Sequence, residues 1–384
     1  MKRIYLDNGS TSFPKAPGVG RAMADYIENE GVNVARGGYA DAYSVAERIL
    51  DTREALCGLF GAPKPENAVF TSGVTASLNI ILKGALKRGD HVICSSMEHN
   101  AVMRPLVQLQ KQGVEFDRVP CLSDGTLPLG ALEQLIKPNT KMVVMTHASN
   151  VCGTVMPAAE VGALCRKHGL FFVLDSAQTA GCVPISVEEM HIDALCFTGH
   201  KGLLGPQGIG GFIISDALAA RTEPLLSGGT GSRSHSEEVP DFMPDKFEAG
   251  TQNIPGILGL RAALEFLQSE GIENIARHEL DMAMALIDGI RDVSGVRIVG
   301  RTVREGRTAV VSVAFENIDN ADAAWRLESE WGILTRCGLH CAPSAHKTLG
   351  TFPAGTVRFV PGRCTTLDEI NTAVRAVKAI AVGK

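Results

Sequence analysis

The chain has 384 residues, 45% of them hydrophobic and 21% charged, and its formal net charge at pH 7 is −5. These values describe an ordinary globular protein that is long enough to bury a large core. Lys and Arg are scattered without a polybasic run, which argues against a nucleic-acid partner and against binding to a membrane surface.

The N-terminal residues contain no apolar h-region, so no secretory signal is predicted. No window approaches the roughly 18 uninterrupted apolar residues that a transmembrane helix needs. The 10 cysteines are dispersed and form no CxxC pair. That distribution is typical of reduced, mostly buried thiols. We therefore expect a cytoplasmic protein without a metal site.

In the middle of the chain, short β-rich runs alternate with helical patterns. Strands are predicted at 91–95, 142–146, 170–174, 194–197 and 208–215, and a helix is predicted at 158–168. Apolar runs of this length between helices indicate a mainly parallel sheet that is covered on both faces. Such sheets bind ligands at the carboxyl ends of their strands, so polar residues directly after strands are the first candidates for a site.

The C-terminal part of the chain has a different pattern. A helix at 254–269 is followed by amphipathic helices at about 274–292 and 367–381 and by strands near 308–315 and 356–360. This mixture indicates a second, α+β unit. We predict a large domain over residues 16–261 and a small domain made of residues 1–15 and 262–384.

Two ionisable residues follow predicted strands. Asp175 comes directly after the run 170–174, where an unpaired carboxylate is costly to bury. It is either a helix cap or turn residue, or a counter-ion for a protonated heterocycle. Lys201 follows the run 194–197 and precedes a glycine-rich segment. It is either a solvated surface lysine or a desolvated amine that attacks an aldehyde.

The segment Thr71-Ser72-Gly73-Val74-Thr75-Ala76-Ser77 precedes an apolar helical pattern. Glycine and small hydroxyl residues at a helix start form an anion site, because backbone N–H groups and the helix dipole favour a phosphate. The same residues also serve as an ordinary helix cap. Polar residues follow the later strands in the order His99, Asn150, Gln178 and His200. Together with the segment 71–77, Asp175 and Lys201, they stand in an order that matches the site residues of one known protein family.

Segments spread over nearly the whole chain carry a family resemblance. They are Tyr5-Leu6-Asp7-Asn8, Asn33-Val34-Ala35-Arg36-Gly37, Met97-Glu98-His99, His147-Ala148-Ser149-Asn150, Asp175-Ser176-Ala177-Gln178, Thr198-Gly199-His200-Lys201, Phe247-Glu248-Ala249-Gly250-Thr251 and Arg336-Cys337-Gly338-Leu339-His340-Cys341. In this order they resemble the class V aminotransferases, of pyridoxal 5′-phosphate (PLP) fold type I, and within them the cysteine desulfurase and selenocysteine lyase branch. The resemblance implies an α/β fold with a large domain, whose mainly parallel sheet is flanked by helices, and a smaller α+β C-terminal domain.

The resemblance also implies how PLP is held. Lys201 would carry it as a Schiff base, Asp175 would pair with the pyridine nitrogen, and His99 would stack on the ring. Gln178 and Asn150 would contact the ring hydroxyl side and the substrate. Further residues are implied to bind the phosphate group, namely Thr75, Thr198 and His200 of the same chain and Thr251 of a neighbouring subunit. The last of these implies a homodimer with shared active sites.

Residues near the substrate are implied by the same comparison. Arg358 matches the arginine that clamps the substrate carboxylate, and Asn8 and Arg336 would lie nearby. Cys341 matches the family's catalytic cysteine, and its short spacing from Arg358 resembles the branch with a compact cysteine loop. As a thiolate it would attack the sulfur of the PLP-bound substrate and become a persulfide, with Lys201 as the general base.

The implied function is that of a cysteine desulfurase, which converts L-cysteine to L-alanine and passes the sulfur to an acceptor protein. The alternatives are a selenocysteine lyase or selenium-delivery enzyme that uses L-selenocysteine, and another class V aminotransferase reaction. Several residues depart from the family pattern. Cys337 stands where familiar members have no thiol and could exchange the persulfide; Leu339 and Ala35 replace histidines, and Val74 replaces a threonine.

Overall fold

The computed structural model describes residues 3–34 and 37–383. Its central sheet has the strand order β2-β8-β7-β6-β5-β3-β4. The strands are β2 (Ala68–Thr71), β3 (His91–Ser95), β4 (Glu115–Val119), β5 (Thr140–Thr146), β6 (Phe171–Asp175), β7 (Ala194–Thr198) and β8 (Gly210–Ile214). Neighbours from β7 to β4 pair in parallel, whereas β8 is antiparallel to both β7 and β2. The mainly parallel sheet that the sequence predicts is confirmed.

Helices cover both faces of this sheet, because its strands are apolar on both sides. In β7, Leu195 and Phe197 belong to one buried cluster, and Ala194 and Cys196 belong to another. The first cluster includes residues of α1 (Val19–Asp25), α2 (Ala40–Phe60), α5 (Leu129–Glu133), α6 (Ala158–His168) and α8 (Ile254–Glu270). The second includes residues of α3 (Val74–Ala85), α4 (Asn100–Gln110) and α7 (Asp216–Arg221). A short π-helix, η1 (Tyr26–Glu30), and a 3₁₀ turn, η2 (Pro65–Asn67), flank α2.

A second, antiparallel sheet follows in the C-terminal part, with the order β12-β13-β10-β9. Its elements are β9 (Val296–Val299), β10 (Val311–Phe315), β12 (Arg336–Gly338) and β13 (Thr356–Phe359), with α9 (Ile272–Ile290), α10 (Asn320–Trp331), α11 (Pro343–Thr348) and α12 (Leu367–Ala381). The N-terminal strand β1 (Ile4–Tyr5) pairs in parallel with β11 (Ile333–Leu334). Ile4 and Leu6 share a buried cluster with residues of α9, α10 and α12. This shared core supports the proposal that residues 1–15 and 262–384 form one small domain.

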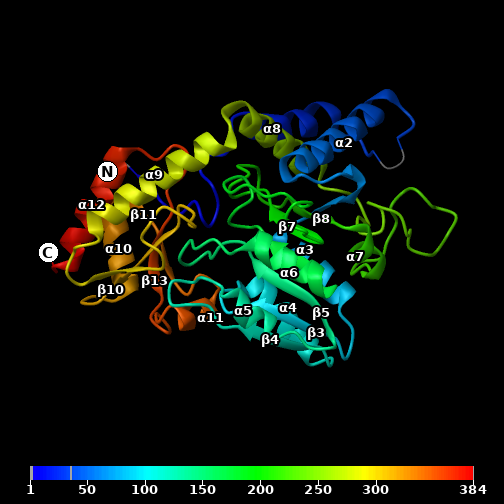
Figure 1. Cartoon of the computed structure of the whole chain (residues 1–384). Helices are drawn as coiled ribbons and strands as arrows, with labels where there is room; N and C mark the ends of the chain where they lie inside the picture. Colours follow the sequence, from blue (N-terminus) through cyan, green and yellow to red (C-terminus); the bar gives the residue numbers. More distant parts are fainter. Residues whose placement is uncertain (1–2, 35–36, 384) are drawn as a thin grey trace.

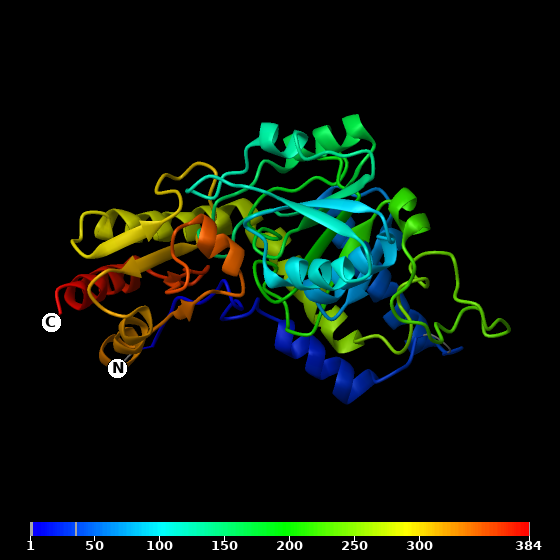
Figure 2. The ribbon, with the colours of Figure 1, turned by 90° about the horizontal axis from the view of Figure 1, so that it is seen from below.

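The two sheets lie side by side, and α8 and α9 follow one another along the molecule to connect them (Figure 1). Both chain ends lie in the C-terminal unit, and the long loop between α7 and α8 extends at the opposite end of the molecule (Figures 1 and 2). Within residues 3–34 and 37–383, no helix combines the length and the apolar character that a membrane span requires.

The predicted elements agree closely with those observed, although the sheet also contains β2 and β4, which were not predicted, and two further differences are informative. The strand at 91–95 and the helices at 158–168 and 367–381 have their predicted bounds. β6 ends one residue later than predicted, so Asp175 is the last residue of the strand. The run 208–215 forms an antiparallel strand, because the described segment 199–209 contains no crossover helix and a parallel return needs one.

Candidate active site

Polar residues gather at one edge of the central sheet. β3, β5, β6 and β7 are parallel neighbours, so their carboxyl ends meet there. β2 is antiparallel to β8, which is antiparallel to β7, so β2 ends at the same edge. The predicted site residues that end these strands or follow their ends are Thr75, His99, Asn150, Asp175, Gln178, Thr198, His200 and Lys201.

Lys201 lies half-buried in the turn after β7. Burial lowers the pKa of its amine to about 8, and the charges of Arg358 and Arg336 lower it further, against the opposing effect of Asp175. The Asp175 carboxylate is only 2% exposed, and burial raises its pKa although it accepts the Ala177 N–H at 2.9 Å. A substantial neutral fraction makes the Lys201 amine a nucleophile near neutral pH.

The loop before α3 lies directly against the end of β7. Gly73 has φ 143°, and a Cβ added there would meet Thr198 Oγ1 at 3.4 Å. A Cβ on Gly210 would come within 2.7 Å of the Gly73 Cα, so only glycine allows this approach. Thr75 is exposed in the first turn of α3, where backbone N–H groups have no intrahelical acceptor. The loop and Thr198 therefore form a cradle suited to an anion.

His99 is the N-cap residue of α4. Its Nδ1 accepts a hydrogen bond from the Ala101 N–H at 3.0 Å. Burial, helped by the charge of Lys201, lowers the pKa of the ring to about 4, so the ring is neutral at physiological pH. Because Nδ1 is the acceptor, the proton of the neutral ring lies on Nε2.

Cys341 lies in a turn after β12 in which His340 (φ 48°) and Cys341 (φ 58°) both have left-handed backbone. This conformation is unfavourable for residues other than glycine and must be held by its surroundings. The Asn100 N–H donates to the Cys341 carbonyl at 2.8 Å, and Asn150 Nδ2 donates to the His340 carbonyl at 2.7 Å. The Cys341 side chain is exposed, with Sγ 3.7 Å from Nη2 of Arg336. The turn thus presents a thiol beside a guanidinium at the ends of β3 and β5.

The two predicted substrate arginines differ in accessibility. Arg358 is paired in register with Arg336 but is only 1% exposed. Its Nη2 donates to Asp7 Oδ1 at 3.0 Å and to Ser10 Oγ at 2.8 Å, and its Nη1 donates to the Asn150 carbonyl at 3.0 Å. Arg336 is half-buried and donates to Ser10 Oγ at 3.1 Å. A substrate carboxylate would have to displace Asp7 to bind Arg358, whereas Arg336 is more open.

Asn8, Gln178 and Lys201 line a small cavity of about 50 Å³. Asn8 Nδ2 donates to the Val360 carbonyl at 2.9 Å, and Gln178 Nε2 donates to the Gly9 carbonyl at 3.2 Å. These bonds tie the N-terminal segment to the turn after β6 and to the residue after β13.

The backbone of His200 also binds the N-terminal segment. Its carbonyl accepts from Lys15 Nζ at 2.8 Å and from the Ser12 N–H at 2.9 Å. Its ring Nδ1 is buried and has no hydrogen-bond partner among residues 3–34 and 37–383. Burial, followed by the charges of Lys201 and Lys15, lowers the pKa of the ring to about 4. The unpaired nitrogen beside Lys201 is an available contact for a ligand.

Thr251 is the predicted site residue that the structure does not bring to this place. It lines a separate cavity of about 360 Å³ together with Asn33, Gly229 and Glu248. None of the other predicted site residues lines that cavity.

Comparisons with known proteins agree with this geometry. The sequence profile described as aminotransferase class-V matches residues 4–372. The chain belongs to the class-V aminotransferase family. A protein from Methanothermobacter thermautotrophicus named "Probable cysteine desulfurase" is 32% identical, with 98% of this chain and 94% of that protein covered.

Solved class-V structures superpose over the whole chain. The apo structure of a cysteine desulfurase from Thermococcus onnurineus NA1 has 31% identity and a TM-score of 0.91, covering 100% of this chain and 95% of that one. The cysteine desulfurase CsdA from Escherichia coli has 28% identity and a TM-score of 0.87, covering 98% and 94%. The predicted fold type I architecture is confirmed.

The residues that depart from the class-V pattern have distinct positions. Cys337 pairs with Val357 across β12 and β13, and Val357 belongs to the small-domain core. Because side chains alternate along a strand, Cys337 faces that core while its neighbour Arg336 faces Cys341. Leu339 is half-buried in the turn, and Val74 is the first residue of α3; Ala35 lies outside the described residues.

Some residues of this class-V site were not predicted from the sequence. Glu98 is fully buried and accepts from the Ser95 hydroxyl and, at 3.0 Å, from the Thr146 N–H, so it joins the ends of β3 and β5. Burial raises its pKa to about 8. Two more unpredicted residues support the site: Ser10 accepts a hydrogen bond from Arg358, and Lys15 donates one to the His200 carbonyl. Short polar runs offer no signal for such contacts, because the partners are distant in sequence.

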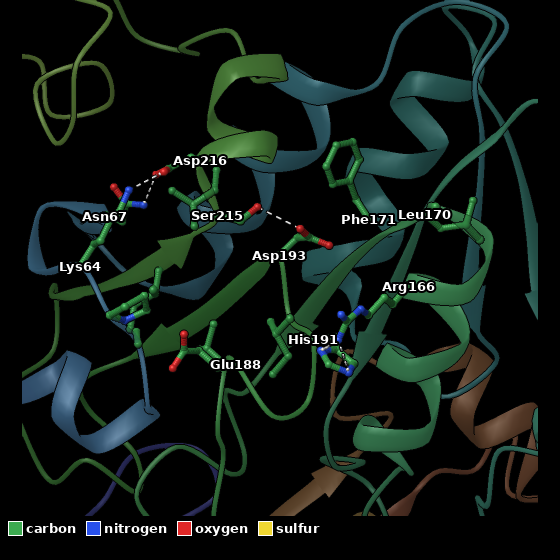
Figure 3. A pocket seen from close by; sticks show the side chains of 17 residues that line it. Lys64, Asn67, Arg166, Leu170, Phe171, Glu188, His191, Asp193, Ser215 and Asp216 are labelled. Carbon is green, nitrogen blue, oxygen red and sulfur yellow. Dashed lines mark hydrogen bonds and ion pairs between the residues drawn. The ribbon is translucent and has the colours of Figure 1, made fainter.

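A further cavity, of about 480 Å³, lies at the opposite edge of the sheet, at the starts of β6 and β7 (Figure 3). Its polar groups are largely paired: Asp193 accepts from the Ser215 hydroxyl at 2.9 Å, and Asp216 accepts from Asn67 at 2.7 Å and from Lys64. None of the predicted site residues lines it.

Proposed function

We propose that this protein is a PLP-dependent cysteine desulfurase, in which Lys201 holds the cofactor and Cys341 receives the sulfur. The observation that carries the proposal is the exposed Cys341 thiol, fixed by the strand-end residues Asn100 and Asn150 and lying 3.7 Å from Arg336 Nη2. Relatives and structural neighbours over the full chain carry the same name. An ordinary transaminase needs no thiol at this position.

The residues at the sheet edge suit PLP. The cradle of Gly73 and Thr198 fits a phosphate, and the buried Asp175 carboxylate fits a protonated pyridine nitrogen. The amine of Lys201 fits the aldehyde, and the unpaired His200 Nδ1 fits a polar contact. We assign the ring face to His99, the ring hydroxyl side to Gln178, and further phosphate contacts to Thr75.

The bound cofactor would draw electrons away from the substrate Cα and so prepare the C–S bond for cleavage. Lys201 would move the Cα proton, since its lowered pKa suits an amine that alternates between acid and base. The Cys341 thiolate would attack the substrate sulfur, forming an S–S bond as the C–S bond breaks. The electron pair of the broken bond stays on the substrate, its Cβ takes up a proton, Lys201 returns the Cα proton, and alanine leaves. Arg336 Nη2 lies 3.7 Å from Cys341 Sγ and donates toward the sulfur, which would help to orient the nucleophile.

The test is the conversion of L-cysteine by the PLP-loaded protein. We expect one alanine released for each persulfide on Cys341, and loss of both in Cys341→Ala with the visible absorption of the cofactor unchanged. The matched control is Cys364→Ala, which removes the other fully exposed thiol among the described residues and should leave turnover intact. Undiminished alanine release by Cys341→Ala would contradict the assignment, and a parallel series with L-selenocysteine measures the selectivity between sulfur and selenium.

We also propose a homodimer in which Thr251 of one copy completes the phosphate site of the other. Thr251 lines a cavity apart from Lys201, and large apolar side chains are exposed nearby in sequence, at Leu225, Leu226 and Phe242. Mixing inactive Lys201→Ala protein with inactive Thr251→Ala protein should restore partial activity, because one site of the mixed dimer is then intact. A monomer in sedimentation experiments would contradict the proposal.

A further inference from the structure

The ring of His340, next to the proposed nucleophile, is held by a directed chain of hydrogen bonds. His340 Nε2 lies 3.0 Å from Thr356 Oγ1, the Thr356 hydroxyl donates to Ser312 Oγ at 3.3 Å, and Ser312 donates to the Val151 carbonyl. A carbonyl only accepts, so the proton of each hydroxyl points along the chain toward Val151. Thr356 Oγ1 must therefore accept, and His340 Nε2 carries the donated proton.

The other nitrogen of this ring is a bare acceptor. Burial, followed by the charges of Arg358, His346 and Arg336, holds the pKa of His340 far below its usual range, so the ring is neutral. With its proton on Nε2, Nδ1 has only a lone pair. Nδ1 is buried and has no hydrogen-bond partner within the described part of the chain.

A second buried histidine, His346 of α11, has the complementary deficiency. Its Nδ1 lies 2.6 Å from Thr351 Oγ1, and its Nε2 is buried without a partner in the described residues. The Thr351 hydroxyl lies closer to Nδ1 than to the His346 carbonyl, which is 3.4 Å away and already accepts the Thr351 N–H at 2.8 Å and the Phe352 N–H at 3.2 Å. We therefore assign the hydroxyl proton to the bond with Nδ1. The proton of the neutral His346 ring is then on Nε2, which makes Nε2 a donor without an acceptor.

The two rings lie next to each other, with centroids 5.5 Å apart and planes inclined by 41°. His340 is 3% exposed and His346 is 0% exposed, so bulk water does not satisfy either nitrogen. One ring offers a buried acceptor and the other a buried donor, and native proteins rarely leave such groups unpaired.

We propose that His346 is a positioning residue for Cys341: its Nε2–H group reaches His340 Nδ1 through one bridging water and fixes the turn that presents the thiol. The left-handed backbone at His340 and Cys341 needs support on both sides. Asn150 and Asn100 hold the two carbonyls from the large domain, and His346 holds the ring from the small domain. The proposal rests on the proposed function only in treating Cys341 as the nucleophile.

The test removes the donor while filling its space. His346→Phe should lower kcat for alanine formation about 10- to 100-fold, with KM and the cofactor spectrum unchanged, because a small misplacement of a reacting group has this effect. His346→Gln, which keeps an N–H donor, should recover part of the loss. If the Phe variant does not fold, His346→Leu makes the same test.

A second readout needs neither cofactor nor turnover. Alkylation of Cys341 by iodoacetamide, followed on its peptide by mass spectrometry, should change several-fold in His346→Phe, while the exposed Cys364 serves as the internal reference. The control is His91→Phe, a fully buried histidine whose partners Thr140 and Asp117 lie at the far edge of the sheet. An unchanged Cys341 alkylation rate, or an equal effect of His91→Phe, overturns the proposal. Absence of alanine from the wild-type protein would instead refute the proposed function and leave the alkylation result interpretable.

Discussion

The side-chain amide of Asn150 donates a 2.7 Å hydrogen bond to the His340 carbonyl. This bond joins the loop after β5 to the turn that carries Cys341, and the Asn150 carbonyl accepts from Arg358 at 3.0 Å. The sequence predicts Asn150 as a contact for the cofactor ring and the substrate. In the structure one N–H of its amide is bonded to the cysteine turn, so Oδ1 and the second N–H are left for a ligand contact.

Replacing Asn150 should therefore affect the nucleophile. Asn150→Asp places a carboxylate oxygen against the His340 carbonyl, and we expect persulfide formation on Cys341 to fall about 10- to 100-fold. Mass spectrometry of the Cys341 peptide after a single turnover measures this. Asn139→Asp is the charge-matched control, because Asn139 donates to the Gly89 carbonyl at an exposed position. Equal persulfide yields in both variants would refute the coupling.

The loading of PLP should depend on pH through Lys201. Only the neutral amine attacks the aldehyde, and the neutral fraction grows as pH rises toward the lowered pKa of about 8. The rate of cofactor binding to apoprotein, followed by its visible absorption, should rise with pH and level off above this value. Asp175→Asn should move the midpoint to lower pH, because the Asp175 charge raises the pKa of Lys201.

Lys15 supplies the control for this titration. Burial lowers its pKa to about 8 as well, but its amine donates to the His200 carbonyl. Lys15→Gln should leave the midpoint of cofactor loading in place. If the midpoint moved in Lys15→Gln and stayed in place in Asp175→Asn, the titrating amine would be Lys15, and the assignment to Lys201 would be wrong.

His99 combines two roles that substitutions can separate. His99→Ala removes the cap of α4 and should cost about 1 kcal/mol of stability. His99→Asn keeps a cap acceptor and should retain the unfolding temperature. If the ring stacks on PLP, both variants lose cofactor affinity to a similar extent in titrations. Full affinity in His99→Asn would limit His99 to capping.

Cys337 should be dispensable for sulfur transfer. Its side chain faces the small-domain core beside Val357, and burial raises the pKa of its thiol, which disfavours the reactive thiolate. Cys337→Ala should form the Cys341 persulfide at the wild-type rate in the single-turnover assay. A large loss of Cys341 persulfide in this variant would instead support the exchange of the persulfide between Cys337 and Cys341.

The segment that carries Thr251 is anchored by a buried ion pair. Arg53 and Glu248 are 6% and 4% exposed at their side chains, and Glu248 also accepts the Phe70 N–H at 2.7 Å. Glu248→Ala leaves the Arg53 charge uncompensated and should lower the free energy of unfolding by about 3–5 kcal/mol. Asp241→Ala, which breaks the exposed pair with Arg233, should cost less than about 1 kcal/mol. Urea unfolding of both variants measures the difference.

The sequence by itself determined the parallel centre of the main sheet and the edge at which the site lies, although it did not predict β2 and β4. Apolar runs such as 91–95 and 170–174 define strands through local hydrophobicity, and the residues after them, including Asp175 and Lys201, are adjacent along the chain to the strand ends. Local patterns also gave the bounds of α6 and α12. The direction of β8 did not follow from its own residues, because it depends on how the connecting segment returns.

Only the tertiary structure decided which distant groups pair and which way their side chains point. Arg358 is bonded to Asp7, Asn150 to the His340 carbonyl, and Cys337 is turned from Cys341 although only Gly338, Leu339 and His340 lie between them. Such pairings join residues that are hundreds of positions apart, and they depend on side-chain direction as well as on residue type. No local pattern encodes that direction, since it is set by the packing of the small domain against the edge of the sheet.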